Sequence, residues 1–245
     1  MDCPVINSDF RQVSDPPAAD RIPGVIFLLF IFISVTEAQT VSTGLPKDIN
    51  PKERYLFYLH GAVVTILGNN AINNGAPEWG PYEYLNILDS LAKNGFTVIS
   101  ENRKEKIDDT VYSNKIVKQI DSLFKKQVSP ESILLIGASA GWNIVLQVAY
   151  KMKHKSMRFV IMGGCWPDTY KDFSGFQLNG NFLSVIEASD PHGTCIAIFE
   201  SRNTMTSYKE IKLNTGLSHG FFYKGRRAWI DPIMQWFNEL PHSQP

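Results

Sequence analysis

One pentapeptide of the sequence has the residue types that an activated serine needs around it. Residues 137–141 (GASAG) match the pattern G-x-S-x-G, in which small residues let a strand and a helix approach closely. The pentapeptide follows an apolar, strand-like run at 133–136 and precedes a helix-like stretch at 141–154. Such a turn presents the hydroxyl of Ser139 at a helix N-terminus, where the amide of Ala140 would point toward an oxyanion. Ser139 is therefore the candidate nucleophile.

A serine nucleophile needs a base and an acid that orients the base. His219 stands in the segment 216–220 (GLSHG), which follows the last strand-like run. Asp190 comes soon after another such run at 182–186, so it is the predicted acid. The chain order serine, acid, histidine is a known order for nucleophiles on a strand-to-helix turn. The predicted catalytic set is therefore Ser139, Asp190 and His219.

Other residues compete for the acid and base roles. Glu187 lies closer to the end of its strand and could replace Asp190, whereas Glu200 falls within a short helix predicted over 193–201 and is a weaker candidate. His192 could act as the base but lies beside the acid turn. The remaining histidines are unsuitable by their positions in the chain, namely His60, His154 and His242.

A second oxyanion donor should come from the loop after the first strand. The sequence His60-Gly61-Ala62 stands there, where Gly61 allows a close backbone approach and the amide of Ala62 is the predicted donor. The candidate substrate pocket consists of residues that could meet an apolar group near the nucleophile: His60, Gly61, Trp79, Trp142 and Trp166. The alternative is that these aromatic side chains pack the loops onto the body of the domain.

These residues need a scaffold in which strands end side by side. Strand-like apolar runs occur at 54–59, 96–100, 133–136, 158–162, 182–186 and 208–213. They alternate with helix-like stretches at 82–93, 112–126, 141–154 and 226–240. The alternation predicts an α/β fold with about six mostly parallel strands and helices on both faces, whose ligands bind beyond the carboxyl ends of the strands. The stretches 40–52, 68–82 and 163–180 are predicted loops, the last too short for a large cap domain.

The charge and the cysteine content of the sequence indicate whether nucleic acid, a metal ion or a disulfide is to be expected. The 245 residues carry 24 basic and 24 acidic side chains without a basic cluster, so nucleic acid is not a predicted partner. No CxxC motif or Cys/His cluster occurs in the sequence, and no metal site is predicted. Cys165 and Cys195 could pair in an oxidising compartment or remain two buried thiols, and the sequence leaves both open.

An apolar segment at residues 25–35 is too short to span a bilayer and fits the core of a secretory signal. Cleavage after Ala38 would leave Gln39 as the N-terminus, although the residues before the segment are acidic where basic ones are typical. We therefore predict an N-terminal extension with a signal peptide at 1–38 and one domain at 39–245, exported to the periplasm or secreted, with no stable membrane span. The alternatives are a membrane anchor or a buried hydrophobic segment formed by 25–35.

Four segments together resemble the α/β-hydrolase superfamily. They are LHG at 59–61, GASAG at 137–141, ASD at 188–190 and GLSHGFFY at 216–223. The resemblance covers roughly residues 54–240 and is closest to small bacterial serine hydrolases of the esterase kind. It implies that an ester, thioester or amide bond of a small molecule is cleaved through an acyl-enzyme on Ser139, without a cofactor.

Two departures from the family pattern qualify this expectation. Too few residues precede Arg54 to supply the extra strands of larger members, so a minimal version of the fold is expected. Trp142 stands where a smaller residue is common, which leaves the specificity for the acyl group open. Because a fold does not guarantee an activity, the alternative function is that of a non-catalytic binding or interaction protein on the same scaffold.

Overall fold

The computed structural model describes residues 40–76, 78–103, 107–199 and 204–241. The predicted signal segment and its cleavage site after Ala38 lie outside these residues and stay predictions. Within the described ranges, no helix combines the length and the apolar character that crossing a bilayer requires.

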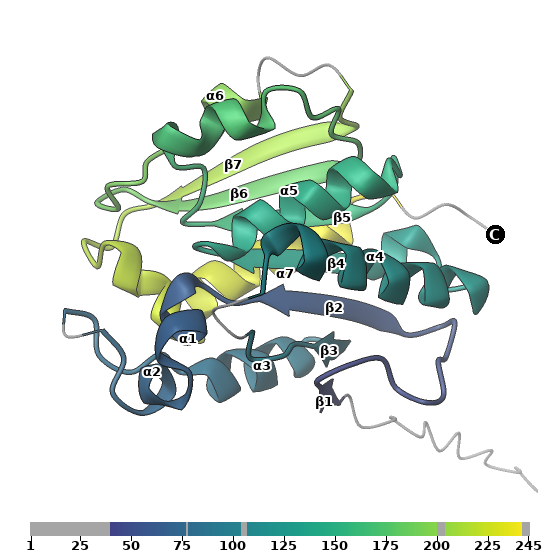
Figure 1. The fold of residues 1–245 in the computed structure, drawn as a ribbon, viewed down its shortest axis with the longest axis horizontal. Coiled ribbons are helices and arrows are strands. Elements are labelled where there is room, and N and C mark those ends of the chain that lie inside the picture. Colours follow the sequence, from purple (N-terminus) through teal and green to yellow (C-terminus); the bar gives the residue numbers. More distant parts are fainter. Residues whose placement is uncertain (1–39, 77, 104–106, 200–203, 242–245) are drawn as a thin grey trace, which may run out of the picture. The chain divides into compact units, whose positions relative to one another are not determined.

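The described chain forms one open sheet of seven parallel strands in the order β1-β3-β2-β4-β5-β6-β7 (Figure 1). The strands are β1 (Val41–Ser42), β2 (Arg54–Leu59), β3 (Phe96–Ile99), β4 (Ile133–Ala138), β5 (Arg158–Met162), β6 (Asn181–Glu187) and β7 (Ser207–Leu213). The predicted parallel α/β fold is thereby confirmed. The additional strand is β1, which lies inside the stretch 40–52 that was predicted to be a loop. It pairs with the end of β3. Two residues are too few to carry a recognisable strand pattern.

The described part of the chain contains seven α-helices. They are α1 (Ala62–Leu67), α2 (Asn69–Asn73), α3 (Tyr84–Ala92), α4 (Asp109–Lys125), α5 (Gly141–Met152), α6 (Ile196–Phe199) and α7 (Arg227–Glu239). Short 3-10 helices occur at η1 (Pro130–Ser132), η2 (Pro167–Phe173) and η3 (His219–Tyr223). The loop prediction for 68–82 was wrong at its start, where α2 forms. Helix α4 begins earlier than predicted because the Asp108 carboxylate caps its first turn, accepting hydrogen bonds from two amides.

Helices cover both faces of the sheet, as predicted (Figure 1). Helices α4 and α5 pack on one face against side chains such as Phe57 of β2, and α3 and α7 pack on the other against Leu56 and Tyr58. Because both faces are covered, all residues of β4 and all but the first of β2 are buried, which accounts for the continuous apolar runs in the sequence.

The register of the strands brings the segments with the predicted catalytic residues to the edge formed by the carboxyl ends of the strands. Leu59 at the end of β2 pairs with Gly137 near the end of β4, so the loop after β2 begins beside the pentapeptide. Glu187 at the end of β6 pairs with Leu213 at the end of β7, so the segments that follow these two strands also begin side by side. The predicted nucleophile, acid and base therefore follow strands that end at the same edge.

A disulfide joins two of the segments at this edge. Cys165, which follows β5, is bonded to Cys195, which precedes α6, across a sequence separation of 30 residues. The structure thus selects the paired alternative that the sequence left open. The bond encloses the 3-10 helix η2, the strand β6 and the turn that carries Asp190.

Candidate active site

Ser139 occupies a sharp turn between β4 and α5. Its backbone has a φ of 49°, a left-handed conformation that non-glycine residues seldom adopt. Its amide donates a hydrogen bond to the carbonyl of Met162 at 2.8 Å, and its carbonyl accepts one from the amide of Trp142 at 2.9 Å. These bonds hold the strained turn between the end of β5 and the first turn of α5.

The glycines of the pentapeptide are required by close packing. A Cβ atom at Gly141 would lie 2.1 Å from the carbonyl oxygen of Leu59, and one at Gly137 would lie 2.6 Å from the carbonyl oxygen of Gly141. Distances below 3.0 Å are essentially never found for real Cβ atoms, so larger residues would force the backbone to move. The G-x-S-x-G spacing is thus explained by the approach of α5 to β2 and β4.

The structure brings the three predicted catalytic residues together. Nε2 of His219 lies 2.9 Å from Oγ of Ser139, and Nδ1 of His219 lies 2.7 Å from Oδ2 of Asp190. An ionised carboxylate can only accept, so Nδ1 carries the proton and Nε2 has a free lone pair for the hydroxyl. Asp190 and His219 are buried and Ser139 is half-buried, so the hydroxyl lies at the solvent end of the chain of hydrogen bonds.

The environment of Asp190 favours its ionised form. Burial alone would raise the pKa of its carboxyl, but the hydrogen bond and the charge of His219 lower that pKa below its ordinary value. The backbone amide of His192 also donates to Oδ1 of Asp190 at 3.0 Å. At neutral pH the carboxylate is therefore available to orient the imidazole.

Glu187, the competing acid, is engaged elsewhere. Its Oε2 accepts hydrogen bonds from the amide of Ser189 at 2.7 Å and from the Ser189 hydroxyl, and its Oε1 accepts from the amides of Thr215 at 2.7 Å and Gly216 at 2.9 Å. The Ser189 hydroxyl in turn accepts a hydrogen bond from the amide of Ser218 at 3.0 Å. Glu187 thus clamps the acid turn to the segment that leads into the histidine. The alternative in which Glu187 replaces Asp190 does not fit this arrangement.

The clamp has a measurable dependence on pH. Burial would raise the pKa of Glu187, but the hydrogen bonds from Ser189, Thr215 and Gly216 outweigh it and lower the pKa from 4.5 to about 2. A carboxyl with a lowered folded-state pKa stabilises the fold above its unfolded pKa and loses this contribution as pH falls toward the folded value. We expect the free energy of unfolding to exceed that of Glu187→Gln at neutral pH, and the difference to shrink between about pH 4.5 and pH 2.

Urea denaturation of the two proteins at several pH values measures this difference. Other titrating groups are present in both proteins and cancel in the comparison. A difference that stayed constant down to about pH 3 would contradict the role of the ionised carboxylate.

His60 shapes the loop beside the nucleophile. Its ring is buried, Nδ1 donates to the carbonyl of Gly61 at 2.9 Å, and Nε2 accepts from the amide of Arg103 at 2.9 Å. The guanidinium of Arg103 also donates to the carbonyl of His60. Burial and the charge of Arg103 lower the pKa of His60 to about 3, so the ring stays neutral. His60 therefore holds the loop in place and does not line an accessible pocket.

The same loop approaches Ser139 closely. A Cβ atom at Gly61 would lie 2.9 Å from Cβ of Ser139, so only glycine permits this approach. Ala62 is the first residue of α1 and Ala140 immediately precedes α5. Amides at the start of a helix have no acceptor within the helix. Both predicted oxyanion donors thus stand where amides are available beside the serine.

The three predicted pocket tryptophans occupy different environments. The half-buried ring of Trp79 packs against His219, with 5.5 Å between ring centroids, and the half-buried ring of Trp166 packs against His192 at 5.0 Å. Trp142 is fully buried beside Phe173 and belongs to the core. Trp79 therefore lies beside His219 and Trp166 beside His192, whereas Trp142 packs under the 3-10 helix η2 through Phe173.

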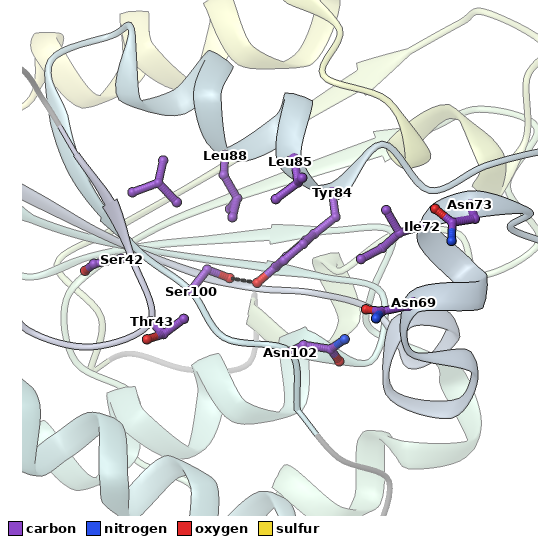
Figure 2. Close-up of a pocket in the computed structure, with 11 residues that line it drawn as sticks. Ser42, Thr43, Asn69, Ile72, Asn73, Tyr84, Leu85, Leu88, Ser100 and Asn102 are labelled. Carbon is purple, nitrogen blue, oxygen red and sulfur yellow. Dashed lines mark hydrogen bonds between the residues drawn. The ribbon is translucent and has the colours of Figure 1, made fainter.

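A separate cavity of about 750 Å³ opens at the same end of the sheet, between β1, α2, α3 and the segment that follows β3. Figure 2 shows Leu85 and Leu88 of α3 on one side of it, and the hydroxyl of Tyr84 pointing toward Ser100. None of its lining residues belongs to the Ser139, His219 and Asp190 set. The ring of Tyr84 packs edge-on against His60, so this side chain is shared between the cavity wall and the loop beside the nucleophile.

Comparisons with known proteins find structural likeness without sequence likeness. A scan against protein-family models finds no match, and neither does a search of curated proteins. The structure of Est1E from Butyrivibrio proteoclasticus matches with a TM-score of 0.52 and 12% identity, covering 80% of this chain and 91% of that one.

Two further solved structures match to a similar degree. A hormone-sensitive lipase from a metagenome library has a TM-score of 0.52 and 15% identity, covering 76% of this chain and 75% of that one. A protein of unknown function from Agrobacterium tumefaciens, described as an α/β-hydrolase candidate, has a TM-score of 0.50 and 15% identity, covering 76% and 83%. At such identities the likeness concerns the fold alone.

Proposed function

We propose that this chain, which has the α/β-hydrolase fold, is a serine hydrolase that cleaves carboxylic esters of small molecules. The observation that carries the proposal is the continuous chain of hydrogen bonds from the Ser139 hydroxyl through His219 to Asp190. A half-buried serine, an imidazole and a buried carboxylate in this order are the groups that acyl transfer requires.

The first half of the proposed reaction forms an acyl-enzyme. Nε2 of His219 takes the proton of Ser139 while Oγ attacks the ester carbonyl, and the negative oxygen is held by the amides of Ala62 and Ala140. The imidazolium of His219, stabilised by the carboxylate of Asp190, then gives the proton to the departing alcohol. The bond between the carbonyl carbon and the alcohol oxygen breaks, and the acyl group remains on Oγ.

The second half releases the acid with the same groups. Water gives a proton to Nε2 of His219 and its oxygen attacks the acyl carbon, after which the bond to Oγ of Ser139 breaks and Oγ recovers the proton. The aromatic rings of Trp79 and Trp166 beside the two histidines favour an apolar or aromatic group on the substrate. Thioesters and activated amides would follow the same steps.

A fluorophosphonate probe tests this proposal directly. Its phosphorus should be attacked by Oγ of Ser139 with loss of fluoride, so mass spectrometry should find one adduct on the peptide that contains Ser139. His219→Gln should prevent labelling because the base is lost, and Ser122→Ala, a change at a half-buried serine of α4, should leave it intact. A folded protein that takes up no label would favour a non-catalytic binding protein, and a label at another serine would show that Ser139 is not the nucleophile.

A further inference from the structure

The turn that carries Asp190 places a second imidazole beside His219. The rings of His192 and His219 meet edge to face, with centroids 4.9 Å apart. One ligand atom from each of Asp190, His192 and His219 lies within 4.8 Å of the others. We propose that these three side chains form a zinc-binding site whose occupation switches off the hydrolase. The inhibitory part of this proposal rests on the proposed function, whereas the binding part does not.

The donor set suits zinc. Two imidazole nitrogens and one carboxylate oxygen are ligands that Zn²⁺ commonly takes in proteins, and a fourth position would remain for water.

The geometry requires only a small local movement. Zinc bonds of about 2.0–2.2 Å place the ligand atoms of a tetrahedral site about 3.4 Å apart. Asp190 and His219 are already in contact at 2.7 Å and can separate around an ion. His192 is half-buried between exposed Pro191 and Gly193, and Gly193 has a φ of 73°. The third ligand is thus on a turn that can adjust while the sheet stays fixed.

Zinc at this site removes the base whichever ring nitrogen of His219 it takes. At Nε2 the ion occupies the lone pair that would accept the Ser139 proton. At Nδ1 the ion replaces the hydrogen bond to Asp190 and the ring proton moves to Nε2, which then has no lone pair to accept the Ser139 proton. The side chain of His192 has no part in the proposed hydrolysis, because only its backbone amide donates to Asp190. No spacing in the sequence marks this site, because His219 meets Asp190 and His192 only through the pairing of β6 with β7.

Zinc binding can be measured without turnover. In untagged Ser139→Ala protein, competition with a chromophoric chelator should report one zinc ion per chain. Adding His192→Gln should weaken the affinity at least about tenfold, as expected for loss of a ligand. Adding His154→Gln, a matched change at a half-buried histidine just after α5, should leave it unchanged. Thermal unfolding without zinc verifies that each variant is folded.

Hydrolysis by the enzyme with Ser139 intact gives the second readout. Zinc should inhibit it, EDTA should restore it, and His192→Gln should raise the half-inhibitory zinc concentration at least about tenfold relative to its own zinc-free rate. Equal zinc affinity with and without His192, or an equal loss with His154→Gln, would overturn the site. Binding that depends on His192 without inhibition would overturn the switch. An enzyme that hydrolyses no ester but binds zinc through His192 would refute the proposed function and leave the site standing.

Discussion

Replacing Ser139 by alanine is expected to lower kcat/KM for an activated acetate ester by at least about 10³-fold. The variant removes Oγ of Ser139, which lies 2.9 Å from Nε2 of His219. It keeps Cβ and the positions of Gly137 and Gly141, so the turn and its packing should be preserved. The loss should therefore come from chemistry and not from the fold.

Initial rates with p-nitrophenyl acetate and thermal unfolding of the same samples test this expectation. Ser122→Ala serves as the matched control, since it removes a hydroxyl from the exposed face of α4. A variant at residue 139 that retained more than about a tenth of the wild-type rate would show that another group is the nucleophile.

Replacing Asp190 by asparagine is expected to lower kcat by roughly 10³- to 10⁴-fold with little effect on folding. The amide of asparagine can donate to Nδ1 of His219, and this favours the tautomer whose Nε2 carries a proton and cannot accept one from Ser139. The variant has nearly the same volume, so the buried turn should keep its shape. The effect is on the orientation and protonation of the base.

Glu187→Gln provides the contrasting change. The NH₂ group of the glutamine side chain cannot accept a hydrogen bond. The donors on either the Ser189 side or the Thr215 side of the clamp therefore lose their acceptor. We expect a loss of about 1–3 kcal/mol in the free energy of unfolding and a much smaller fall in kcat than for Asp190→Asn. Steady-state kinetics and urea denaturation of both variants separate the two roles. If Glu187→Gln abolished turnover and Asp190→Asn did not, the acid would be Glu187.

The sequence was sufficient to predict the parallel α/β fold because its strands are buried on both faces and stand out as apolar runs. It was also sufficient to select Ser139, Asp190 and His219, because each follows a strand whose carboxyl end lies at the same edge. The structure brings these three side chains into one chain of hydrogen bonds. Their catalytic roles await the experiments above.

What the sequence missed depends on contacts between distant segments. The bonds from Arg103 to His60 join residues 43 apart, and no local pattern marks them. The clamp formed by Glu187 likewise depends on the register of β6 with β7. Trp142 was assigned to the pocket because it follows the serine, but a helix start can direct such a side chain into the core, and here it does.

The disulfide has a consequence for the covalent continuity of the chain. Residues between Cys165 and Cys195 form a closed covalent ring. The disulfide is a second covalent connection between the chain before Cys165 and the chain after Cys195. A single proteolytic cut within this ring would therefore leave one molecule held together by covalent bonds. Two fragments could part only after the sulfur bridge was reduced.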